Sequence, residues 1–591
     1  MSTTSLEELV DAWLRTDQNE VTRSEIQKLW EKSDTKELER RLRPRIEFGT
    51  AGLRGKMEAG WARMNDLIII QASQGLCQYV LKEVRDAKSR GIVIGHDHRY
   101  NSEKWAQLTA AAFLENGMKV YLFRGLVHTP LVPFGVKLNA ACGVMITASH
   151  NPKDDNGYKV YWENAVQIIA PHDKGISSSI NANLTPRTWS IDQVHSSADC
   201  LDVTEQIKKA YFSEIEKLKL PQYSPSAEPL IFVNTSMHGV SHPIVTEALN
   251  SFGVSVNPVK EQMLPDPEFP TVPFPNPEEK GALDLAIAQA KKCNGNYVLA
   301  QDPDSDRFSA CELHPTGGVT TFTGDQLGTI FAAHVFESYR DSGKPLSKLA
   351  IVASTVSSKM VEAMAKQEGF KFVECLTGFK YIGNTALDLV QKGYEVPFGY
   401  EEAIGYMFGS EIRDKDGVAA SVVFAQLAAI LHGQGKTIRS YLDDLYQRYG
   451  YFKTSNSYFM CNDPQVIDAI FARLRNYNGK RSGADYPKKI AGLEIISVVD
   501  LTTGYDSANP PTYQPSLPLS SGHMIQFRGE QKSEGTKIVL TIRTSGTEPK
   551  IKYYLEGSGK DNRVVSELLP RVVSELGTDW MQASMYKLGH P

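Results

Sequence analysis

Short apolar runs alternate with longer stretches of helical periodicity through much of the chain. The apolar runs cover residues 92–97, 120–123, 143–149, 229–236, 297–302 and 348–355. Residues 103–116 have a helical pattern, with Asn101 and Ser102 placed to cap its start and Gly117 placed to end it. Strands that alternate with helices of this length predict an α/β fold with βαβ units and mainly parallel sheets.

The two ends of the chain follow other patterns. Ser5 and Glu8 form a capping box that predicts an amphipathic helix at the N-terminus. After Tyr451, short segments separated by polar loops, such as residues 508–521, favour antiparallel pairing. Residues 418–431 are the most apolar long run, but they are shorter than the roughly 20 residues that cross a bilayer. We therefore expect a buried helix there.

Proline-, serine- and glycine-rich stretches suggest the domain boundaries. They occur at residues 221–229, in an expected surface loop at 265–277, and at 316–324. Together with the change after Tyr451, they predict four domains, which cover residues 1–224, 225–322, 323–448 and 449–591.

Composition excludes several classes of protein. The 591 residues are 41% hydrophobic and carry 64 Lys and Arg against 69 Asp and Glu, a net charge of −5. This balance, without a basic block, gives no support for nucleic-acid binding, and the acidic N-terminus lacks the apolar core of a signal peptide. Seven scattered cysteines without a CxxC pair favour neither disulfides nor a zinc site. We expect a reduced, cytoplasmic protein that is not a membrane protein.

Three carboxylates follow the apolar strand expected at residues 297–302. Asp302, Asp304 and Asp306 occupy alternate positions in DPDSDR (302–307), so a tight turn can direct their oxygens at one hard cation such as Mg²⁺. The carboxyl ends of strands are where open α/β sheets bind ligands. A solvated acidic turn is the alternative interpretation.

A serine follows another buried strand, in TASHNP (147–152). Ser149 is placed for nucleophilic chemistry and His150 is its neighbour, although adjacent side chains need not face each other. The flanking Thr147 and Asn151 differ from the glycines of a hydrolase nucleophile elbow. Considered alone, this stretch favours a helix N-cap after a strand over a nucleophile.

Further polar loops offer anion-binding groups, and a plain charged turn is the alternative for each. RTSGTEP (543–549) combines a guanidinium with two hydroxyls, a donor set that suits a phosphate. FGTAGLRG (48–55) surrounds Arg54 with glycines. GYEEAIG (399–405) and RDKDG (413–417) supply an acidic pair and Lys415. Together with the serine and the Asp turn, these loops describe phosphoryl transfer on a polyhydroxy substrate.

TASHNP, DPDSDR, GYEEAIG and RTSGTEP, in this order, closely resemble the α-D-phosphohexomutase superfamily. The amino-acid sequences of residues 151–162 and of PHDKGI (171–176) are most similar to those of the phosphoglucomutase type 2 and phosphopentomutase branch. This resemblance covers about residues 48–554. It implies three similar mixed α/β domains and a C-terminal α+β domain around a central cleft, with interdomain closure.

The resemblance also implies a role for each candidate residue. Ser149 would be the phosphoserine, and Mg²⁺, one per chain, would bind to Ser149, Asp302, Asp304 and Asp306. The sugar and the non-reacting phosphate would be bound by Thr377, Gly378, Glu401, Arg543, Ser545, Gly546 and Thr547. The transferring phosphoryl group would be surrounded by Arg54, Arg307 and Lys415. Lys415, or less favourably His150, would be the general acid/base; a lysine can act as a base only where its pKa is depressed.

One departure bears on the substrate. The other phosphoglucomutase branch has a serine two residues after the sugar-binding glutamate, where this chain has Ala403. The loss of a hydroxyl donor makes a pentose 1-phosphate a credible substrate beside glucose 1-phosphate.

The resemblance therefore implies a phosphosugar mutase with a sugar 1,6-bisphosphate as activator. Its partners would be small phosphosugars, and its state a monomer or weak homodimer. A glucose-1,6-bisphosphate synthase that uses 1,3-bisphosphoglycerate is the alternative activity. A non-catalytic homologue is the alternative of another class, which the intact serine and aspartates disfavour.

Overall fold

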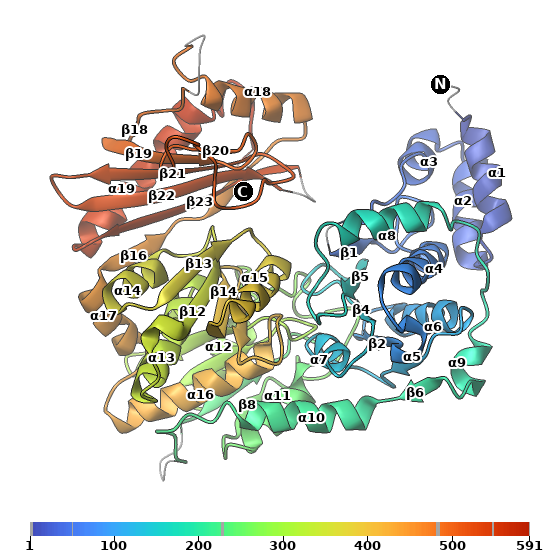
Figure 1. The fold of residues 1–591 in the computed structure, drawn as a ribbon, viewed down its shortest axis with the longest axis horizontal. Coiled ribbons are helices and arrows are strands. Elements are labelled where there is room, and N and C mark those ends of the chain that lie inside the picture. The colour runs from blue at the N-terminus through green and yellow to red at the C-terminus, as the bar shows by residue number, and fades with distance from the viewer. Residues whose placement is uncertain (1–3, 50, 226–229, 480–484, 546–548, 590–591) are drawn as a thin grey trace. The chain divides into compact units, whose positions relative to one another are not determined.

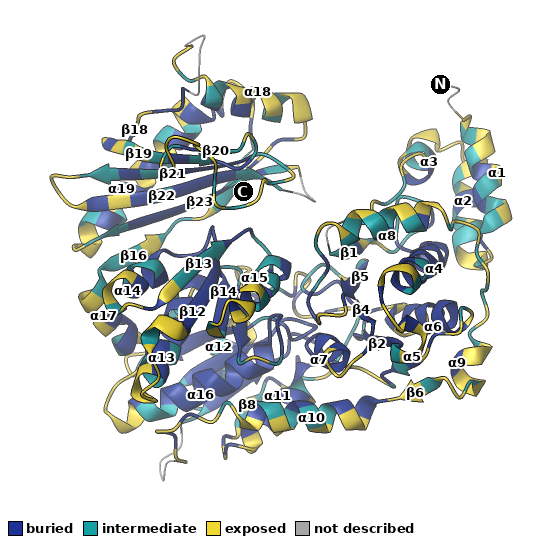
Figure 2. Cartoon of the chain, in the orientation of Figure 1, coloured by how far each residue is buried: buried dark blue, intermediate teal, exposed yellow. Residues whose placement is uncertain are grey.

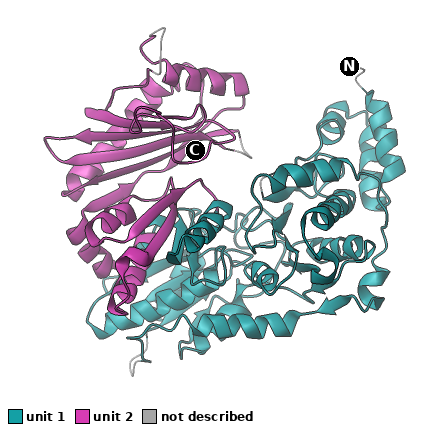
Figure 3. Cartoon of the chain, viewed as in Figure 1, with its two compact units in different colours: residues 1–327, 379–438 teal, residues 328–378, 439–591 magenta. Residues whose placement is uncertain are grey.

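The computed structural model describes residues 4–49, 51–225, 230–479, 485–545 and 549–589. The chain divides into two compact units, and each is considered by itself (Figure 3). Unit 1 comprises residues 1–327 and 379–438, and unit 2 comprises residues 328–378 and 439–591. The predicted α/β fold class is confirmed by the alternation of helices and strands (Figure 1).

Unit 1 begins with three helices that pack on one another: α1 (Leu6–Thr16), α2 (Glu20–Glu31) and α3 (Thr35–Leu42). The expected capping box is present, because Ser5 Oγ accepts from the Glu8 amide and Glu8 accepts from the Ser5 amide. Val10 and Trp13 form the apolar face of α1. Asn19 Nδ2 donates to Asp66 Oδ2 at 2.7 Å, which attaches these helices to the following α/β region.

The first sheet of unit 1 has the strand order β1-β5-β4-β2-β3-β6. Its strands are β1 (Gly52–Lys56), β2 (Ile92–His96), β3 (Val120–Leu122), β4 (Cys142–Ile146), β5 (Asp155–Tyr161) and β6 (Cys200–Asp202). Its helices are α4 (Asp66–Glu83), α5 (Ala87–Arg90), α6 (Ser102–Leu114), α7 (Leu131–Lys137), α8 (His172–Asn181), α9 (Asp192–Ser196) and α10 (Thr204–Glu216). β2, β3, β4 and β6 pair in parallel, whereas β5 and β1 are antiparallel additions.

The second sheet of unit 1 has the order β11-β10-β9-β7-β8. Its elements are β7 (Phe232–Thr235), α11 (Ser241–Asn250), β8 (Val256–Pro258), α12 (Asp284–Lys292), β9 (Tyr297–Ala300), β10 (Ser309–Leu313) and β11 (Val319–Thr321). Unit 1 also contains α15 (Phe379–Gln391), β14 (Glu395–Glu401), β15 (Gly405–Phe408) and α16 (Gly417–Gly433). The buried strands lie between helices whose outer faces are exposed (Figure 2).

Helix α16 confirms the expected buried helix, because residues 417–428 and Leu431 are all buried. No single helix within the described ranges is long and apolar enough to cross a membrane. α16 and the helix that follows it (Ile438–Tyr449) together have the length and composition of a membrane span, but the pair is bent at the break between them.

Unit 2 contains a parallel pair of strands and an antiparallel sheet of order β16-β23-β22-β21-β19-β18. In this sheet β17 also pairs with β23, and β20 also pairs with β19. Helices α13 (Gly324–Asp341) and α17 (Ile438–Tyr449) begin with residues of unit 1 and continue into unit 2. Its other elements are a 3₁₀ turn (Leu346–Lys348), β12 (Leu349–Ser354), α14 (Met360–Glu368), β13 (Lys371–Cys375), β16 (Tyr451–Thr454), β17 (Ser457–Met460), α18 (Pro464–Arg475), β18 (Lys489–Ile490), β19 (Leu493–Asp500), β20 (Tyr505–Asp506), β21 (Met524–Gln531), β22 (Thr536–Thr544), β23 (Lys550–Gly559), α19 (Asn562–Glu575) and a π-helical turn (Leu576–Trp580). The sheet confirms the antiparallel pairing expected after Tyr451.

All seven cysteines lie within the described ranges, and all are free thiols. The structure therefore agrees with the expectation of no disulfide framework.

Candidate active site

Ser149 lies in a tight turn after β4, and a buried guanidinium fixes its backbone. Its φ is 53°, a left-handed conformation that is uncommon outside glycine. The Ser149 amide donates to Thr147 Oγ1 at 2.9 Å. Arg99 Nη2 donates to the carbonyl oxygens of Ser149 and Asn151, each at 2.6 Å, and Arg99 Nη1 donates to that of Asp155 at 3.1 Å. Contacts from outside the turn therefore hold the Ser149 hydroxyl in place.

The three aspartates converge in the turn after β9. Ser305, at φ 57°, donates its amide to the carbonyl of Asp302 at 2.8 Å, which closes the turn. Oxygen atoms of Asp302, Asp304 and Asp306 lie within 4.8 Å of one another, and all three side chains are buried. The turn thus brings together the carboxylates that the sequence spacing predicted would converge.

This carboxylate group fits a hard cation. The Oδ1 atoms of Asp304 and Asp306 are buried and have no hydrogen-bond partner among the described residues, an arrangement that is costly unless a cation or proton satisfies it. Burial and the negative charges of Asp304 and Asp306 raise the pKa of Asp302 well above its usual range. The donors are all carboxylate oxygens, the ligands that Mg²⁺ prefers.

Ser149 and the Asp turn meet directly. Ser149 Oγ donates to Asp302 Oδ2 at 2.7 Å and accepts from Arg307 Nη1 at 2.8 Å. The side chains of Ser149 and His150 face one another, because His150 Nδ1 lies 3.3 Å from Ser149 Oγ. The structure therefore places the candidate nucleophile beside the candidate metal ligands and a guanidinium.

His150 is held as a neutral ring. Arg307 Nη1 lies 2.7 Å from His150 Nδ1, and because a guanidinium can only donate, Nδ1 is the acceptor and the ring proton is on Nε2. Burial, followed by the positive charges of Arg307 and Arg54, lowers the pKa of His150 well below its usual range.

Lys159 is a site residue to which the sequence analysis gave no role. Its Nζ donates to Asp304 Oδ2 at 2.7 Å and to Asp306 Oδ2 at 2.9 Å. Burial lowers the pKa of Lys159, but the two aspartates raise it by more. The available signal was a lysine between the apolar residues Tyr158 and Val160 of the buried strand β5, where a buried charge needs a partner.

Lys415 and Glu401 complete the group in unit 1. Lys415 Nζ lies 3.2 Å from Asp306 Oδ2 and 3.6 Å from Asp414 Oδ1. Burial lowers the pKa of Lys415, but these carboxylates raise it by more, so the amine is protonated at neutral pH. The depressed pKa that a lysine base requires is therefore not present in this arrangement. Glu401 ends β14, and burial raises its pKa to about 7.

Arg54 and Arg307 approach the serine turn from two directions. Arg54, on β1, donates from Nη1 to Asn151 Oδ1 at 3.2 Å and is otherwise exposed. Arg307 Nε donates to the carbonyl of Ala403 at 3.0 Å. Position 403 therefore orients Arg307 through its main chain, which any residue there can do.

The other candidates belong to unit 2 or fall outside the description. Those in unit 2 are Thr377, Gly378, Arg543 and Ser545. Arg543, at the end of β22, donates from Nη2 to Tyr554 Oη at 2.9 Å, while its Nε is buried without a hydrogen-bond partner among the described residues. This open donor suits an anion. Gly546 and Thr547 lie outside the described residues.

Three family profiles match the chain, all described as phosphoglucomutase/phosphomannomutase α/β/α domains. Domain I matches residues 45–187, domain II residues 209–315 and domain III residues 323–449. The chain belongs to this family. The phosphoglucomutase/phosphomannomutase profiles contain the Ser149 turn, the Asp turn and the Glu401 loop.

Curated relatives resemble this family member over nearly its whole length. A protein of Schizosaccharomyces pombe named probable phosphoribomutase is 46% identical, with 99% of both chains covered. A human phosphopentomutase is 43% identical over 98% of this chain and 96% of the relative. A human glucose 1,6-bisphosphate synthase is 41% identical over 98% and 95%. The predicted phosphopentomutase branch is thereby confirmed, and the chain is an enzyme of the phosphosugar mutase class.

The fold also matches solved structures of the family. A putative phosphomannomutase from Thermus thermophilus has a TM-score of 0.63 at 20% identity, covering 90% of this chain and 99% of that one.

Proposed function

We propose that this phosphosugar mutase interconverts the 1-phosphates and 5-phosphates of ribose and deoxyribose, and glucose 1-phosphate and 6-phosphate, through a phosphoserine at Ser149. The observation that carries the proposal is the position of Ser149 Oγ, 2.7 Å from Asp302 Oδ2 and 2.8 Å from Arg307 Nη1. The buried hydroxyl donates a hydrogen bond to a carboxylate and accepts one from a guanidinium, which can also bind a phosphoryl oxygen. This arrangement is suited to phosphoryl transfer.

Each turnover would comprise two transfers. In the first, the bond between phosphorus and Ser149 Oγ breaks, a bond from phosphorus to the free sugar hydroxyl oxygen forms, and the proton of that hydroxyl is transferred to Ser149 Oγ, which becomes a free hydroxyl. The product is a sugar bisphosphate, which reorients in the site. In the second, the phosphoryl group at its other end returns to Ser149 Oγ, and the proton that Ser149 loses is taken up by the sugar oxygen released.

The basic groups around Ser149 divide these tasks. Arg307, oriented by the carbonyl of Ala403, would bind the transferring group together with Arg54. Lys415 is protonated and would deliver the proton to the departing sugar oxygen. The neutral His150 is the second candidate for moving a proton at this position.

Asp302, Asp304 and Asp306, with an oxygen of the phosphorylated Ser149, would hold one Mg²⁺ ion. The Oδ1 atoms of Asp304 and Asp306, which accept no hydrogen bond from the described residues, support this assignment. When bound, the ion supplies charge neutralisation at the transferring group. Lys159 would keep Asp304 and Asp306 oriented by binding their other oxygens.

The substrate preference rests on relatives and on one residue. Relatives named phosphoribomutase and phosphopentomutase share 43–46% of their residues with this chain. Ala403 lacks a hydroxyl that a hexose could use. Glu401, Thr377 and Gly378 would contact the sugar, and Arg543, Ser545, Gly546 and Thr547 its other phosphate. Catalysis would depend on a sugar 1,6-bisphosphate as activator, in a cytoplasmic monomer or weak homodimer.

A second candidate function is glucose-1,6-bisphosphate synthesis from 1,3-bisphosphoglycerate, favoured by the 41% identity to human glucose 1,6-bisphosphate synthase. Assays with and without that donor separate the two functions. Negligible mutase turnover with added sugar bisphosphate, together with rapid turnover on the donor, would select the synthase.

The main test is the variant Ser149→Ala. We expect kcat to fall at least about 1000-fold with each substrate, because the residue that accepts the phosphoryl group is lost. Ser213→Ala, on the exposed face of α10, is the matched control and should keep full activity. The ratio of kcat/KM for ribose 1-phosphate to that for glucose 1-phosphate, measured on the wild-type enzyme, is expected to exceed one. Wild-type rates in Ser149→Ala would end the proposal.

A further inference from the structure

A cavity of about 610 Å³ lies in unit 1 between the N-terminal helices and the segment after α8. It combines arginines and tryptophans with neutral polar side chains and has no aspartate or glutamate in its lining. The residues that matter here are Arg15, Arg43, Arg45, Trp61, Gln71 and Trp189. None of them belongs to the candidate active site.

Arg45 carries a charge that no carboxylate neutralises. Its guanidinium donates to Gln71 Oε1, and no ion pair joins Arg45 to any residue in the described part of the chain. Burial alone lowers its pKa to about 10. Gln71 is itself held, because its Nε2 donates to the carbonyl of Leu184 at 2.6 Å. A fixed, partly desolvated cation without a counter-charge is unfavourable for folding and favourable for binding an anion.

Of the other two arginines at this cavity, Arg15 adds a second positive charge that is not paired within the described residues, whereas that of Arg43 is neutralised. Arg15 is exposed at the end of α1 and makes no ion pair with the residues that the structure describes. Arg43 is paired with Glu39. Arg23 donates hydrogen bonds to the carbonyl oxygens of Leu14 and Asp17 at the C-terminus of α1. These bonds reduce the negative partial charge that the two carbonyl groups would otherwise present near the cavity.

Two indole rings supply apolar walls. Trp61 and Trp189 are half-buried, and both pack against the core of the N-terminal helices and the core of the first sheet. The edge contact of Trp61 with Trp13, at 5.5 Å between ring centroids, fixes its plane. Indole faces stack on nucleobases and on the C–H faces of sugars, while guanidinium groups bind phosphate.

We propose that this cavity is a second anion site, which binds a phosphate ester carried on a sugar or nucleoside ring. Its volume lies within the roughly 300–1000 Å³ that small-ligand sites occupy. The phosphate would bind to Arg45 and Arg15, and the ring would lie against Trp61 and Trp189.

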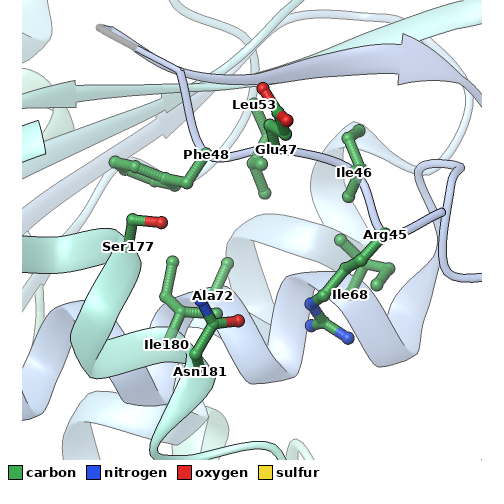
Figure 4. Close-up of a pocket in the computed structure, with 10 residues that line it drawn as sticks. All are labelled: Arg45, Ile46, Glu47, Phe48, Leu53, Ile68, Ala72, Ser177, Ile180 and Asn181. Atoms are coloured by element: carbon green, nitrogen blue, oxygen red, sulfur yellow. The ribbon is translucent and has the colours of Figure 1, made fainter. Parts of the chain in front are cut away.

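The position of Arg45 connects this site to the chemistry. Arg45 also lines a neighbouring pocket of about 320 Å³ under the segment that leads to β1 (Figure 4). Ile46 donates its amide to the carbonyl of Trp61 at 2.7 Å. Arg54 lies further along the same segment, on β1. A ligand on Arg45 would therefore bind nine residues before Arg54 in the sequence.

The test is equilibrium binding followed by tryptophan fluorescence on the full-length enzyme. The probes are inorganic phosphate, adenosine 5′-monophosphate and glucose 1,6-bisphosphate, which distinguish a bare phosphate, a nucleoside and a sugar as the carrier. The Ser149→Ala variant serves as background so that no probe is turned over. We expect saturable quenching by at least one ring-bearing probe, lost in Trp189→Phe.

The variants Arg45→Gln and Arg15→Gln should each weaken that probe at least about 10-fold, with unchanged or higher melting temperature for Arg45→Gln. Arg40→Gln is the matched control, because Arg40 lies on α3 and pairs with Glu37 outside the cavity. Glucose 1,6-bisphosphate should show two sites in isothermal titration, of which Arg45→Gln removes one. Absence of Arg45-dependent binding for all three probes at millimolar concentration, or equal affinities in Arg45→Gln and Arg40→Gln, would overturn the proposal. Glucose 1,6-bisphosphate that still binds at one site independent of Arg45 would leave the proposed mutase activity standing.

Discussion

Burial keeps two histidines of unit 1 uncharged. It lowers the pKa of His98 to about 4 and that of His128 to about 3. Both ring nitrogens of His128 are buried without a hydrogen-bond partner among the described residues, and the ring packs edge-on against Tyr211 at 4.8 Å. His128 therefore behaves as an aromatic ring of the core that a proton would destabilise.

His128→Phe should make the protein less sensitive to acid. Between pH 6.5 and about 3 the unfolded chain protonates His128 and the folded chain does not, so wild-type stability falls as the pH decreases. The variant lacks this loss. We expect its advantage in the free energy of unfolding to grow by about 1.4 kcal/mol per pH unit over that range, measured by urea denaturation at several pH values.

The control is His195→Gln, because His195 lies on the surface rather than in the core. Parallel stability curves for His128→Phe and the wild type would contradict the neutral, buried assignment.

At the residue scale, the sequence predicted which side chains lie together where similar side chains recur within a few residues of one another. The three aspartates of one turn could be expected to converge, because a few backbone bonds determine their separation. Lys159 and Arg99 could not be assigned, because each acts on atoms that only the sheet brings near: Asp304 is 145 positions away from Lys159. Such pairs cannot be identified from the sequence alone, because the two residues become neighbours only in the folded structure.

Among the elements, β5 determines the site most directly. It lies between β4 and β1, and its register places Lys159 opposite Met145 and Gly157 opposite Arg54. A Cβ on Gly157 would lie 2.5 Å from the carbonyl oxygen of Thr147 and 3.1 Å from that of Leu53. The strand can therefore approach the serine turn only with glycine at this position.

Gly157→Ala should separate β5 from the turn that carries Ser149. We expect a loss of about 1–3 kcal/mol in the free energy of unfolding and a decrease in kcat of at least about 10-fold, because Lys159 and Ser149 move apart. Denaturant unfolding and steady-state kinetics measure the two effects.

Gly433→Ala is the matched control, since a Cβ at this position in α16 meets nothing within 4 Å. It should stabilise the protein by about 0.5–1 kcal/mol with unchanged kcat. Equal behaviour of the two variants would show that the close approach at Gly157 is unimportant.

Element prediction succeeded for the buried strands and was less complete for their pairing. The apolar runs at residues 92–97 and 297–302 correspond to β2 and β9. The expected parallel order holds for the centre of the first sheet, but β1 and β5 run antiparallel. The glycine- and threonine-rich residues 316–324 include β11, which pairs with β10. Composition identifies weak helix formers, and tertiary pairing can still place them in a sheet.

At the scale of the whole molecule, the candidate residues are divided between the two units. The serine, the aspartates and the lysines belong to unit 1, whereas Arg543 and Ser545 belong to unit 2. Metal binding and phosphate binding can therefore be observed separately in one protein.

Mg²⁺ added to chelator-treated enzyme should protect unit 1 selectively. In hydrogen exchange, amides of residues 147–157 and 302–307 should exchange more slowly, because a cation satisfies the partnerless oxygens of Asp304 and Asp306. At 100 times the dissociation constant, the stabilisation should be about 2.7 kcal/mol. Amides of β22 should not change. Asp304→Asn should abolish the effect, and equal protection of β22 would place the main metal site elsewhere.

Family and enzyme class could be recognised from four short motifs, because each motif is a contiguous stretch of sequence. The division into two compact units could not be derived from sequence, since α13 and α17 continue across the boundaries without a break in helical pattern.

Lys159 has a consequence for how the enzyme is made. Its amine binds Asp304 and Asp306 from inside the fold, so part of the repulsion among the carboxylates is relieved by the polypeptide itself. A newly synthesised chain can therefore form the turn after β9 before it encounters a cation. Magnesium supply would then limit how many molecules are active, rather than how many survive to maturity.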